Sequence, residues 1–129
     1  MLDESSKLYF EARTAIEAND LSLALEKLRS SAALLPHYKT YELLGECLLQ
    51  RSEPVEAVLY LSAAAGLANK QTRCRYLLAQ ALVRLTPSRE VDAIEKLQEA
   101  LALNPQYKAA RQLLEEIMQR RSDKGLNSP

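Results

Sequence analysis

Few side chains in this 129-residue sequence could take part in chemistry. His37 is the only histidine, and an imidazole can act as a general base near neutral pH. Its place in a turn is more typical of a solvated histidine. Cys47 and Cys74 are the only cysteines. Arg73 and Arg75 flank Cys74 and would lower its thiol pKa if the side chain were exposed, although an ordinary helix cysteine is the simpler interpretation.

These residues do not assemble into a recognisable reactive site. No Ser/His/Asp or Cys/His arrangement can be built from the sequence, so we expect no catalytic residues. Glycine-rich phosphate loops and metal-ligand clusters are missing, which predicts no cofactor and no metal. The two cysteines have neither metal-ligand spacing nor the density of a disulfide framework. We therefore expect reduced thiols and a cytoplasmic location.

Charge and hydrophobic pattern narrow the class of partner. Seventeen basic and seventeen acidic residues give a formal charge of zero, whereas nucleic-acid binding depends on excess positive charge. No run approaches the ~18 apolar residues of a membrane helix, and acids near the start argue against a secretory signal. The sequence thus predicts no nucleic-acid partner and no membrane partner.

Composition indicates an all-α protein. Apolar residues make up 47% of the chain, enough for a buried core, and glycine occurs only three times. Strong helix formers such as Ala, Leu, Glu, Lys, Arg and Gln dominate, and alternating β-branched runs are absent.

The chain also repeats itself, with copies of one pattern beginning at Ala24, Ala57 and Ala93. Each copy has a leucine four residues after the alanine, a small residue three further on, and a break in the helical pattern five beyond that. The copies are 33 and 36 residues apart. Such a period is the signature of a helical repeat array.

A second small residue precedes each copy, at Ala12, Gly45 and Ala79. Ala81 could be aligned in place of Ala79, but Leu78-Ala79 then no longer matches Leu44-Gly45. With Ala79, two extra residues in the third copy fall at Thr86-Pro87-Ser88, in a turn. Small residues at both positions let two antiparallel helices approach to ~8–10 Å.

Turn residues set the expected helix ends. Asn19-Asp20 provides an N-cap, Pro54 suits a first helical turn, and Asn104-Pro105 combines both signals, which places Pro105 at the first helical position. The expected helices cover about residues 3–18, 21–34, 38–51, 54–67, 70–85, 89–103 and 105–121.

The pattern Leu44-Gly45, Ala57, Leu61 and Ala64, with its period of about 34 residues, resembles the tetratricopeptide repeat (TPR). The resemblance implies a right-handed α-solenoid of three TPR-like helical hairpins plus a C-terminal capping helix. Residues 1–121 would form a single domain, with repeats at about 5–37, 38–70 and 71–106 and the capping helix at about 105–121. Residues 122–129 have no helical pattern, and we expect a disordered tail.

In this family the first helix of each pair lines a concave groove. The exposed stripe on those helices holds tyrosines and arginines, which are common at binding hot spots. A solvated mixed-charge face would look the same. The predicted peptide-binding residues are Tyr9, Arg13, Lys39, Glu42, Glu46, Arg73, Tyr76, Gln80, Lys108 and Arg111.

A subset of the family grips the acidic C-terminal tails of chaperones with lysine, asparagine and arginine side chains. The corresponding positions hold Tyr9, Arg13, Leu43, Arg73 and Leu77. Only Arg73 keeps the charge type, and both asparagine positions are lost. The sequence therefore argues against a chaperone C-terminal tail as the partner.

Three classes of function follow from the sequence. The leading hypothesis is a non-catalytic adaptor or scaffold that binds a peptide or helix of a partner protein in the groove. The alternative is self-association, as a structural part or a piece of a longer repeat array. An enzyme or nucleic-acid binder has no supporting motif. Light scattering at high concentration would separate the first two.

The repeat alignment makes a testable prediction about packing. Ala57→Leu or Ala93→Leu would overpack a hairpin and lower the free energy of unfolding by about 1–3 kcal/mol. A thermal melt that shows no loss for either variant would contradict the alignment.

Overall fold

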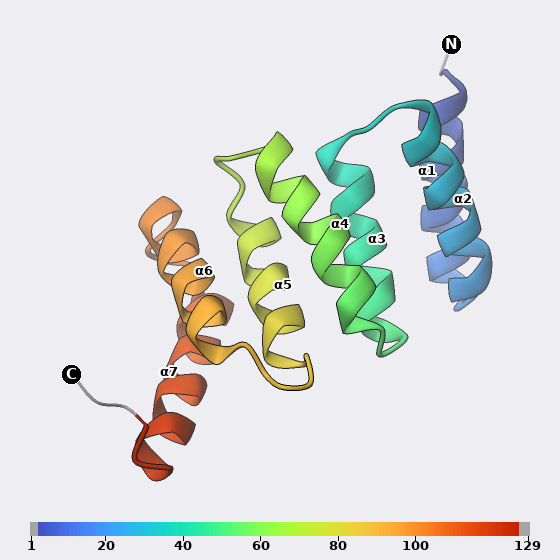
Figure 1. Ribbon diagram of the computed structural model, residues 1–129. Coiled ribbons are helices and arrows are strands. Elements are labelled where there is room, and N and C mark those ends of the chain that lie inside the picture. Colours follow the sequence, from blue (N-terminus) through green and yellow to red (C-terminus); the bar gives the residue numbers. More distant parts are fainter. Residues whose placement is uncertain (1–2, 127–129) are drawn as a thin grey trace. The chain divides into compact units, whose positions relative to one another are not determined.

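The computed structural model describes residues 3–126, which form seven α-helices and no strand (Figure 1). The helices are α1 (Glu4–Glu17), α2 (Leu21–Leu34), α3 (Tyr38–Gln50), α4 (Pro54–Leu67), α5 (Thr72–Val83), α6 (Glu90–Leu103) and α7 (Lys108–Asp123). The predicted all-α class is confirmed. Residues 1–2 of the predicted domain and 127–129 of the predicted tail lie outside the described residues.

Two compact units divide the chain between Asn69 and Lys70. In unit 1, α1 packs on α2 and α3 on α4, and α2 also contacts α3. In unit 2, α5 packs on α6 and α6 contacts α7. Each described helical hairpin therefore pairs two helices that are consecutive in the sequence.

Two of the helices begin at a carboxylate cap. The Asp20 carboxylate accepts a hydrogen bond from the Leu23 N–H at 3.1 Å and opens α2. Asp3 does the same for Ser6 at 2.7 Å and opens α1. This backbone hydrogen bond holds the pKa of Asp3 below its usual 3.8. Pro54 occupies the first turn of α4, as predicted.

Small residues lie where the two helices of each pair meet. The side chains of the six positions identified from the repeat are fully buried or absent: Ala12 and Ala24, Gly45 and Ala57, Ala79 and Ala93. At Gly45 the approach is tightest, because a Cβ atom there would lie within 3.0 Å of three carbons of Leu61. The leucines Leu28, Leu61 and Leu97 fill the adjacent space and are fully buried.

One backbone hydrogen bond closes the turn of every hairpin. The N–H of the residue before the second helix donates to a carbonyl in the last two turns of the first helix. The pairs are Asp20 to Ala15 at 2.8 Å, Glu53 to Leu48 at 2.9 Å and Arg89 to Leu82 at 3.0 Å. These carbonyls lie three residues after Ala12, Gly45 and Ala79. The bond therefore supports aligning Ala79, and not Ala81, with Gly45.

The third turn is longer than the other two. Three residues link α1 to α2 and α3 to α4, whereas residues 84–89 link α5 to α6. In the short turns Asn19 and Ser52 adopt left-handed backbone with φ of 61° and 59°. No residue of 84–89 has a positive φ. The two extra residues lie between Leu82 and Arg89, the segment that contains Thr86-Pro87-Ser88.

The predicted start of the last helix at Pro105 is wrong, because α7 begins at Lys108. Asn104 caps a separate turn: its side-chain oxygen accepts from the Gln106 N–H at 3.0 Å, and its carbonyl accepts from the Tyr107 N–H at 3.1 Å. Pro36 and His37 likewise precede α3. In both places the proline therefore lies in the turn before the helix and not in its first turn.

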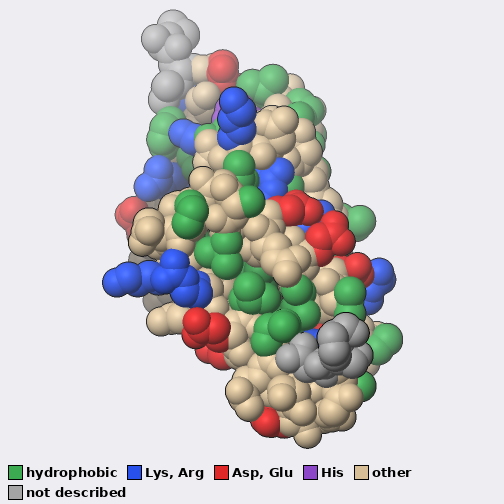
Figure 2. All heavy atoms as spheres, turned by 90° about the vertical axis from the view of Figure 1, so that its left-hand side faces the viewer, with side chains coloured by type: hydrophobic (Ala, Val, Ile, Leu, Met, Phe, Trp, Pro, Cys, Tyr) green, Lys and Arg blue, Asp and Glu red, His purple; other side chains and the backbone are tan. Residues whose placement is uncertain are grey.

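Further along, α7 packs one face against the rest of unit 2. Ala110 and Ile117 are fully buried, while Arg111 and Glu115 are exposed. At its far end, Arg120 and Arg121 form ion pairs with Glu90 of α6 at 3.5 and 3.4 Å. Figure 2, which looks from the side of α6 and α7, shows hydrophobic side chains still gathered there among charged ones.

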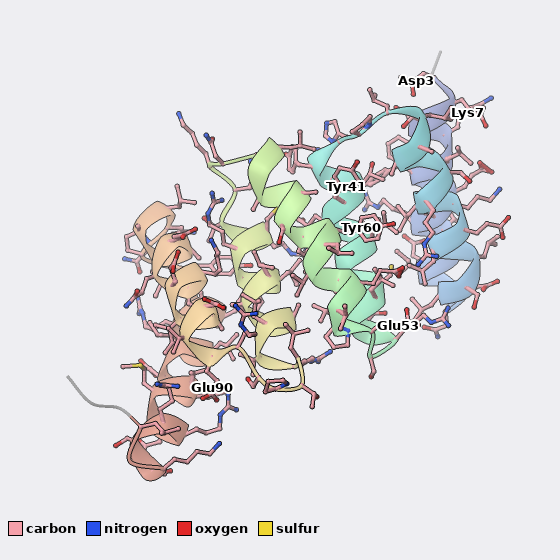
Figure 3. All side chains as sticks on the ribbon, viewed as in Figure 1. Asp3, Lys7, Tyr41, Glu53, Tyr60 and Glu90 are labelled. Atoms are coloured by element: carbon pink, nitrogen blue, oxygen red, sulfur yellow. The ribbon has the colours of Figure 1, made fainter. Side chains whose placement is uncertain are left out.

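Polar and aromatic contacts vary between otherwise similar hairpins. Tyr41 of α3 stacks on Tyr60 of α4 with ring centroids 5.8 Å apart, as Figure 3 shows. Arg75, at the position equivalent to Tyr41, is nearly buried and pairs with Glu99 at 3.4 Å. Opposite-charge pairing offsets the cost of burying that guanidinium. The hairpins thus keep their backbone spacing while the contacting side chains differ.

The first hairpin has a buried serine pair in place of an apolar contact. The Ser5 hydroxyl donates to the Ser31 carbonyl at 3.1 Å, and the Ser31 hydroxyl donates to the Ser5 carbonyl at 2.8 Å. Ser31 is fully buried, yet both hydroxyls are satisfied.

Two helical glycines make a matched test of this packing. Gly45→Ala places a methyl group against Leu61, and we expect the free energy of unfolding to fall by about 1–3 kcal/mol. Gly66→Ala meets no atom within 4 Å, so we expect a gain of up to about 1 kcal/mol from helix propensity. Urea denaturation measures both. Equal responses of the two variants would contradict the close approach at Gly45.

Candidate functional site

A hollow in unit 1 lies where α1 faces the start of α3. Its volume is about 270 Å³. The lining residues are Ser5, Ser6, Tyr9, Phe10, Arg13, Leu35, His37, Lys39 and Thr40. We call this hollow the α1–α3 pocket. It contains three of the residues predicted from the sequence, namely Tyr9, Arg13 and Lys39.

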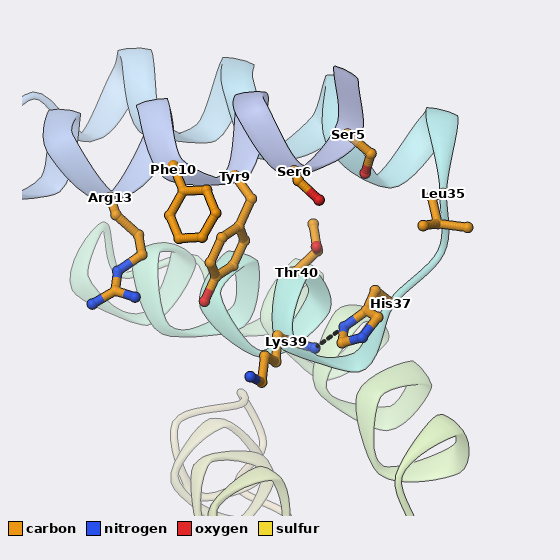
Figure 4. A pocket seen from close by; sticks show the side chains of 9 residues that line it. All are labelled: Ser5, Ser6, Tyr9, Phe10, Arg13, Leu35, His37, Lys39 and Thr40. Carbon is orange, nitrogen blue, oxygen red and sulfur yellow. Dashed lines mark hydrogen bonds between the residues drawn. The ribbon is translucent and has the colours of Figure 1, made fainter. Parts of the chain in front are cut away.

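Each wall of the pocket is positioned by a different segment (Figure 4). Tyr9 and Arg13 are four residues apart and therefore project from the same face of α1. Phe10 stands beside Tyr9 edge-on, with ring centroids 5.6 Å apart, and keeps 47% of its surface exposed. On the opposite side, the N–H of Lys39 donates to Nδ1 of His37 at 3.1 Å, which fixes the imidazole at the start of α3.

The pocket is basic and partly apolar. Arg13, Lys39 and His37 contribute its titratable nitrogen groups, and no lining residue is acidic. Three hydroxyl side chains, Ser5, Ser6 and Thr40, add hydrogen-bonding groups, although Ser5 is already bonded to Ser31. The rings of Tyr9 and Phe10 form an apolar side wall. This combination suits a ligand with an acidic group next to an apolar one.

The other predicted residues of unit 1 do not line this pocket. Glu42 and Glu46 are half-buried positions further along α3. They lie one turn apart, on a helix whose start forms the pocket wall. The structure therefore brings together the basic members of the predicted set in unit 1 and leaves its two acids outside the pocket lining.

In unit 2 the predicted residues are partly engaged with one another. The Gln80 amide donates to the Tyr76 hydroxyl at 3.0 Å, and the Tyr76 ring packs edge-on against Tyr107 at 5.6 Å. Arg111 hydrogen-bonds to the carbonyl of Pro105, in the turn before its own helix. The side chains of Arg73 and Lys108 are exposed. Tyr76 and Gln80 are thus held in place by contacts within unit 2.

Sequence reasoning missed most of the apolar side of the α1–α3 pocket. Phe10, Leu35 and Thr40 were not predicted, and His37 was assigned to a solvated turn. A signal existed at Phe10, because an exposed phenylalanine beside Tyr9 breaks the polar pattern of α1. Leu35 had no such signal, because it follows the last residue of α2 and its direction depends on the path of the loop to α3.

The hypothesis of a reactive Cys74 is wrong, because its side chain is fully buried despite its arginine neighbours. Cys47 is also buried, with 1% of its surface exposed. Burial, followed by the charge of Glu46, raises the pKa of the Cys47 thiol to about 11. Among residues 3–126 no three His, Cys, Asp or Glu side chains gather in a way that could hold a metal ion.

None of the helices described has both the length and the apolar character needed to cross a bilayer.

Comparisons with known proteins agree on the architecture. No protein-family model and no curated protein matches the sequence. Among solved structures, the first TPR of Spaghetti (RPAP3) bound to the HSP90 peptide SRMEEVD has a TM-score of 0.86 and 15% identity, over 92% of this chain and 94% of that chain. The Yersinia enterocolitica translocator chaperone SycD has a TM-score of 0.83 and 17% identity, over 94% and 96%.

MamA from Desulfovibrio magneticus RS-1 is similar as well, with a TM-score of 0.83 and 22% identity over 95% of this chain and 67% of that one. The chain therefore has the tetratricopeptide-repeat fold that the resemblance implied. At these identities the likeness defines the fold and leaves the partner open.

The buried thiols lead to a prediction about reactivity. Since a raised pKa keeps the thiol protonated, the thiolate fraction of Cys47 near pH 8 should be about a hundredfold below that of an ordinary cysteine. We expect neither cysteine to react with Ellman's reagent until urea unfolds the chain, and Ser62→Cys, an exposed control, to react at once. Fast stoichiometric labelling of the folded wild type would contradict the burial.

Proposed function

We propose that the protein is a non-catalytic interaction module that holds an extended peptide or a helix of a partner protein against α1 and α3, the first helices of the two hairpins in unit 1. The observation that carries the proposal is the α1–α3 pocket, where Tyr9, Arg13 and Lys39 converge on one hollow. A similar structure, the RPAP3 domain, is bound to a peptide, which supports a binding role for this scaffold.

The chemistry of the pocket indicates the kind of segment it would take. Arg13 offers a planar guanidinium that can bind a carboxylate through two hydrogen bonds, and Lys39 adds a second positive charge. Tyr9 and Phe10 supply rigid aromatic surface at low entropic cost. We infer an acidic peptide whose neighbouring apolar side chain packs on these rings.

A chaperone C-terminal tail remains a poor candidate for this peptide. Of the positions that would clamp such a tail, Leu77 is buried and Leu43 is half-buried and apolar. Neither can donate a hydrogen bond from its side chain. We expect a Glu-Glu-Val-Asp peptide to bind no more tightly than a scrambled peptide of equal charge.

Binding can be measured with an array of fluorescent peptides that vary in charge and in one apolar residue. We expect the tightest members to be acidic, and we expect their affinity to fall as salt rises, because exposed charge pairs are screened. Arg13→Ala with Lys39→Ala should weaken these peptides about tenfold or more, since each lost ionic hydrogen bond is worth ~1 kcal/mol or more.

A matched control removes the same charge outside the pocket. Lys7→Ala with Lys27→Ala alters exposed and half-buried positions of α1 and α2 that do not line it. We expect this control to bind like the wild type. Equal loss of affinity in both double variants would mean that net charge, and not the pocket, controls binding. If neither the wild type nor the control bound any peptide, the proposed function would be contradicted.

A further inference from the structure

The outward face of α4 is apolar and free of charge. Val55, Leu59, Ser62 and Gly66 occupy the exposed positions along it, and Leu67 lies beside the last of them. Val55 keeps 69% of its surface exposed, Leu59 67% and Leu67 55%. We call Val55, Leu59, Ser62 and Gly66 the α4 stripe. It belongs entirely to unit 1 and contributes nothing to the α1–α3 pocket.

The equivalent helices differ from α4 at the two middle positions of this stripe. Where α4 has Leu59, α2 has Glu26 and α6 has Glu95, both exposed. Where α4 has Ser62, α2 has Arg29 and α6 has Gln98. Two of the three hairpins therefore place a charged or amide side chain at these positions, as expected for a face turned to water. At its two middle positions the α4 stripe therefore departs from the repeat, toward apolar and small residues. At the outer two the helices are more alike, with Val91 of α6 at the position of Val55 and with Ala33 and Ala102 at the position of Gly66.

Gly66 is not required by the fold of the chain itself. A Cβ atom at this position would meet nothing within 4 Å, and its φ is not positive. Glycine in a helix costs about 0.5–1 kcal/mol relative to alanine. Gly66 thus lowers the stability of the helix, and no contact within the described chain requires it. A glycine at such a position is explained if the backbone or a large side chain of another molecule approaches it closely.

The spacing of the α4 stripe fits a helix partner. Residues 55, 59, 62 and 66 are separated by four, three and four, which is the seam spacing of helices that interlock as in a coiled coil. Along this seam the large residues come first and the small ones last. Because of this order, a second copy of the helix that runs in the opposite direction places its small residues opposite the large ones.

We propose that the α4 stripe is the contact surface for a second copy of this chain, with the two α4 helices antiparallel. A two-fold axis between residues 60 and 61 places Val55 opposite the partner's Gly66 and Leu59 opposite the partner's Ser62. Every level of the seam then joins a large side chain to a small one. An isologous contact of this kind closes on itself as a dimer.

Charge favours the antiparallel direction. A parallel pair would bring the two Glu53 carboxylates at the exposed starts of α4 together, and like charges repel. The antiparallel pair instead sets each Glu53 near the partner's Ala65 and Ala68, which carry no charge. Opposed helix dipoles also attract, whereas parallel ones repel.

The size of the surface sets the expected strength. Four side chains on one helix cover much less than the ~800 Å² that each partner buries in a standard interface. We therefore infer a weak dimer with a dissociation constant of about 10–1000 μM, populated at high local concentration. It leaves the α1–α3 pocket of each copy outside the contact surface.

Sedimentation equilibrium of the full chain from about 10 μM to about 1 mM tests the proposal, over the range where a weak dimer would populate. We expect reversible dimerisation of the wild type. Leu59→Glu restores the charge of the other hairpins, and Gly66→Leu fills the gap opposite Val55. Both should raise the dissociation constant about tenfold or more, because each disrupts the pairing of a large side chain with a small one along the seam. Both sites are exposed, so the circular dichroism spectrum should be unchanged.

Val91→Glu is the matched control, because Val91 occupies on α6 the position of Val55 and is 64% exposed. It should dimerise like the wild type. A second readout is cross-linking with a short bismaleimide, which should join two copies of Ser62→Cys and leave Gln98→Cys monomeric. A wild type that stays monomeric throughout, or a dimer that survives Leu59→Glu and Gly66→Leu, overturns the proposal.

Discussion

The close approach of two helices at alanine-sized contacts is the constraint on which this fold depends. At Gly45 there is no room for even one methyl group, because Leu61 fills the space. Backbones that come so close must have small residues on both sides, which is why Ala57 faces the same seam. Leu61, which leaves no room for a side chain at position 45, is itself fully buried. This one contact therefore contributes to both the spacing and the core of the α3–α4 pair.

Around that constraint the chain tolerates different chemistry. A tyrosine stack, an arginine–glutamate pair and a reciprocal serine pair each occur at the side of a hairpin. These contacts differ in polarity, yet the serine hydroxyls are hydrogen-bonded and the Arg75 guanidinium has a carboxylate partner. Such contacts add to a seam that is already formed, and a repeat can therefore diverge in sequence while its two helices keep their register.

The sequence predicted the fold well because its signals are local and repeated. Helical period, caps such as Asp20 and small residues at fixed spacing all act within one hairpin, and the small residues recur in all three copies. The start of α7 was wrong because Asn104 and Pro105 can cap a helix or build a turn before it. The choice depends on where Tyr107 packs, which is tertiary information.

The site was less predictable because its geometry depends on tertiary structure. Helical spacing could place Tyr9 and Arg13 on one face, but the pocket also needs Leu35 and His37 from a loop whose path no pattern encodes. Cys74 shows the converse, because its arginine neighbours suggested reactivity while the fold directs its side chain inward. Charged residues that flank a side chain in the sequence indicate its environment only when it is known which face of the helix that side chain occupies.

The longer turn between α5 and α6 has a practical consequence for protein engineering. It contains two additional residues, yet the hydrogen bond from Arg89 to Leu82 still closes it. The ends of the helices are thus tied together independently of the residues between them, and lengthening a surface loop costs little in closure entropy. This turn is the natural place to splice in an epitope, a fluorophore attachment sequence or a small guest domain.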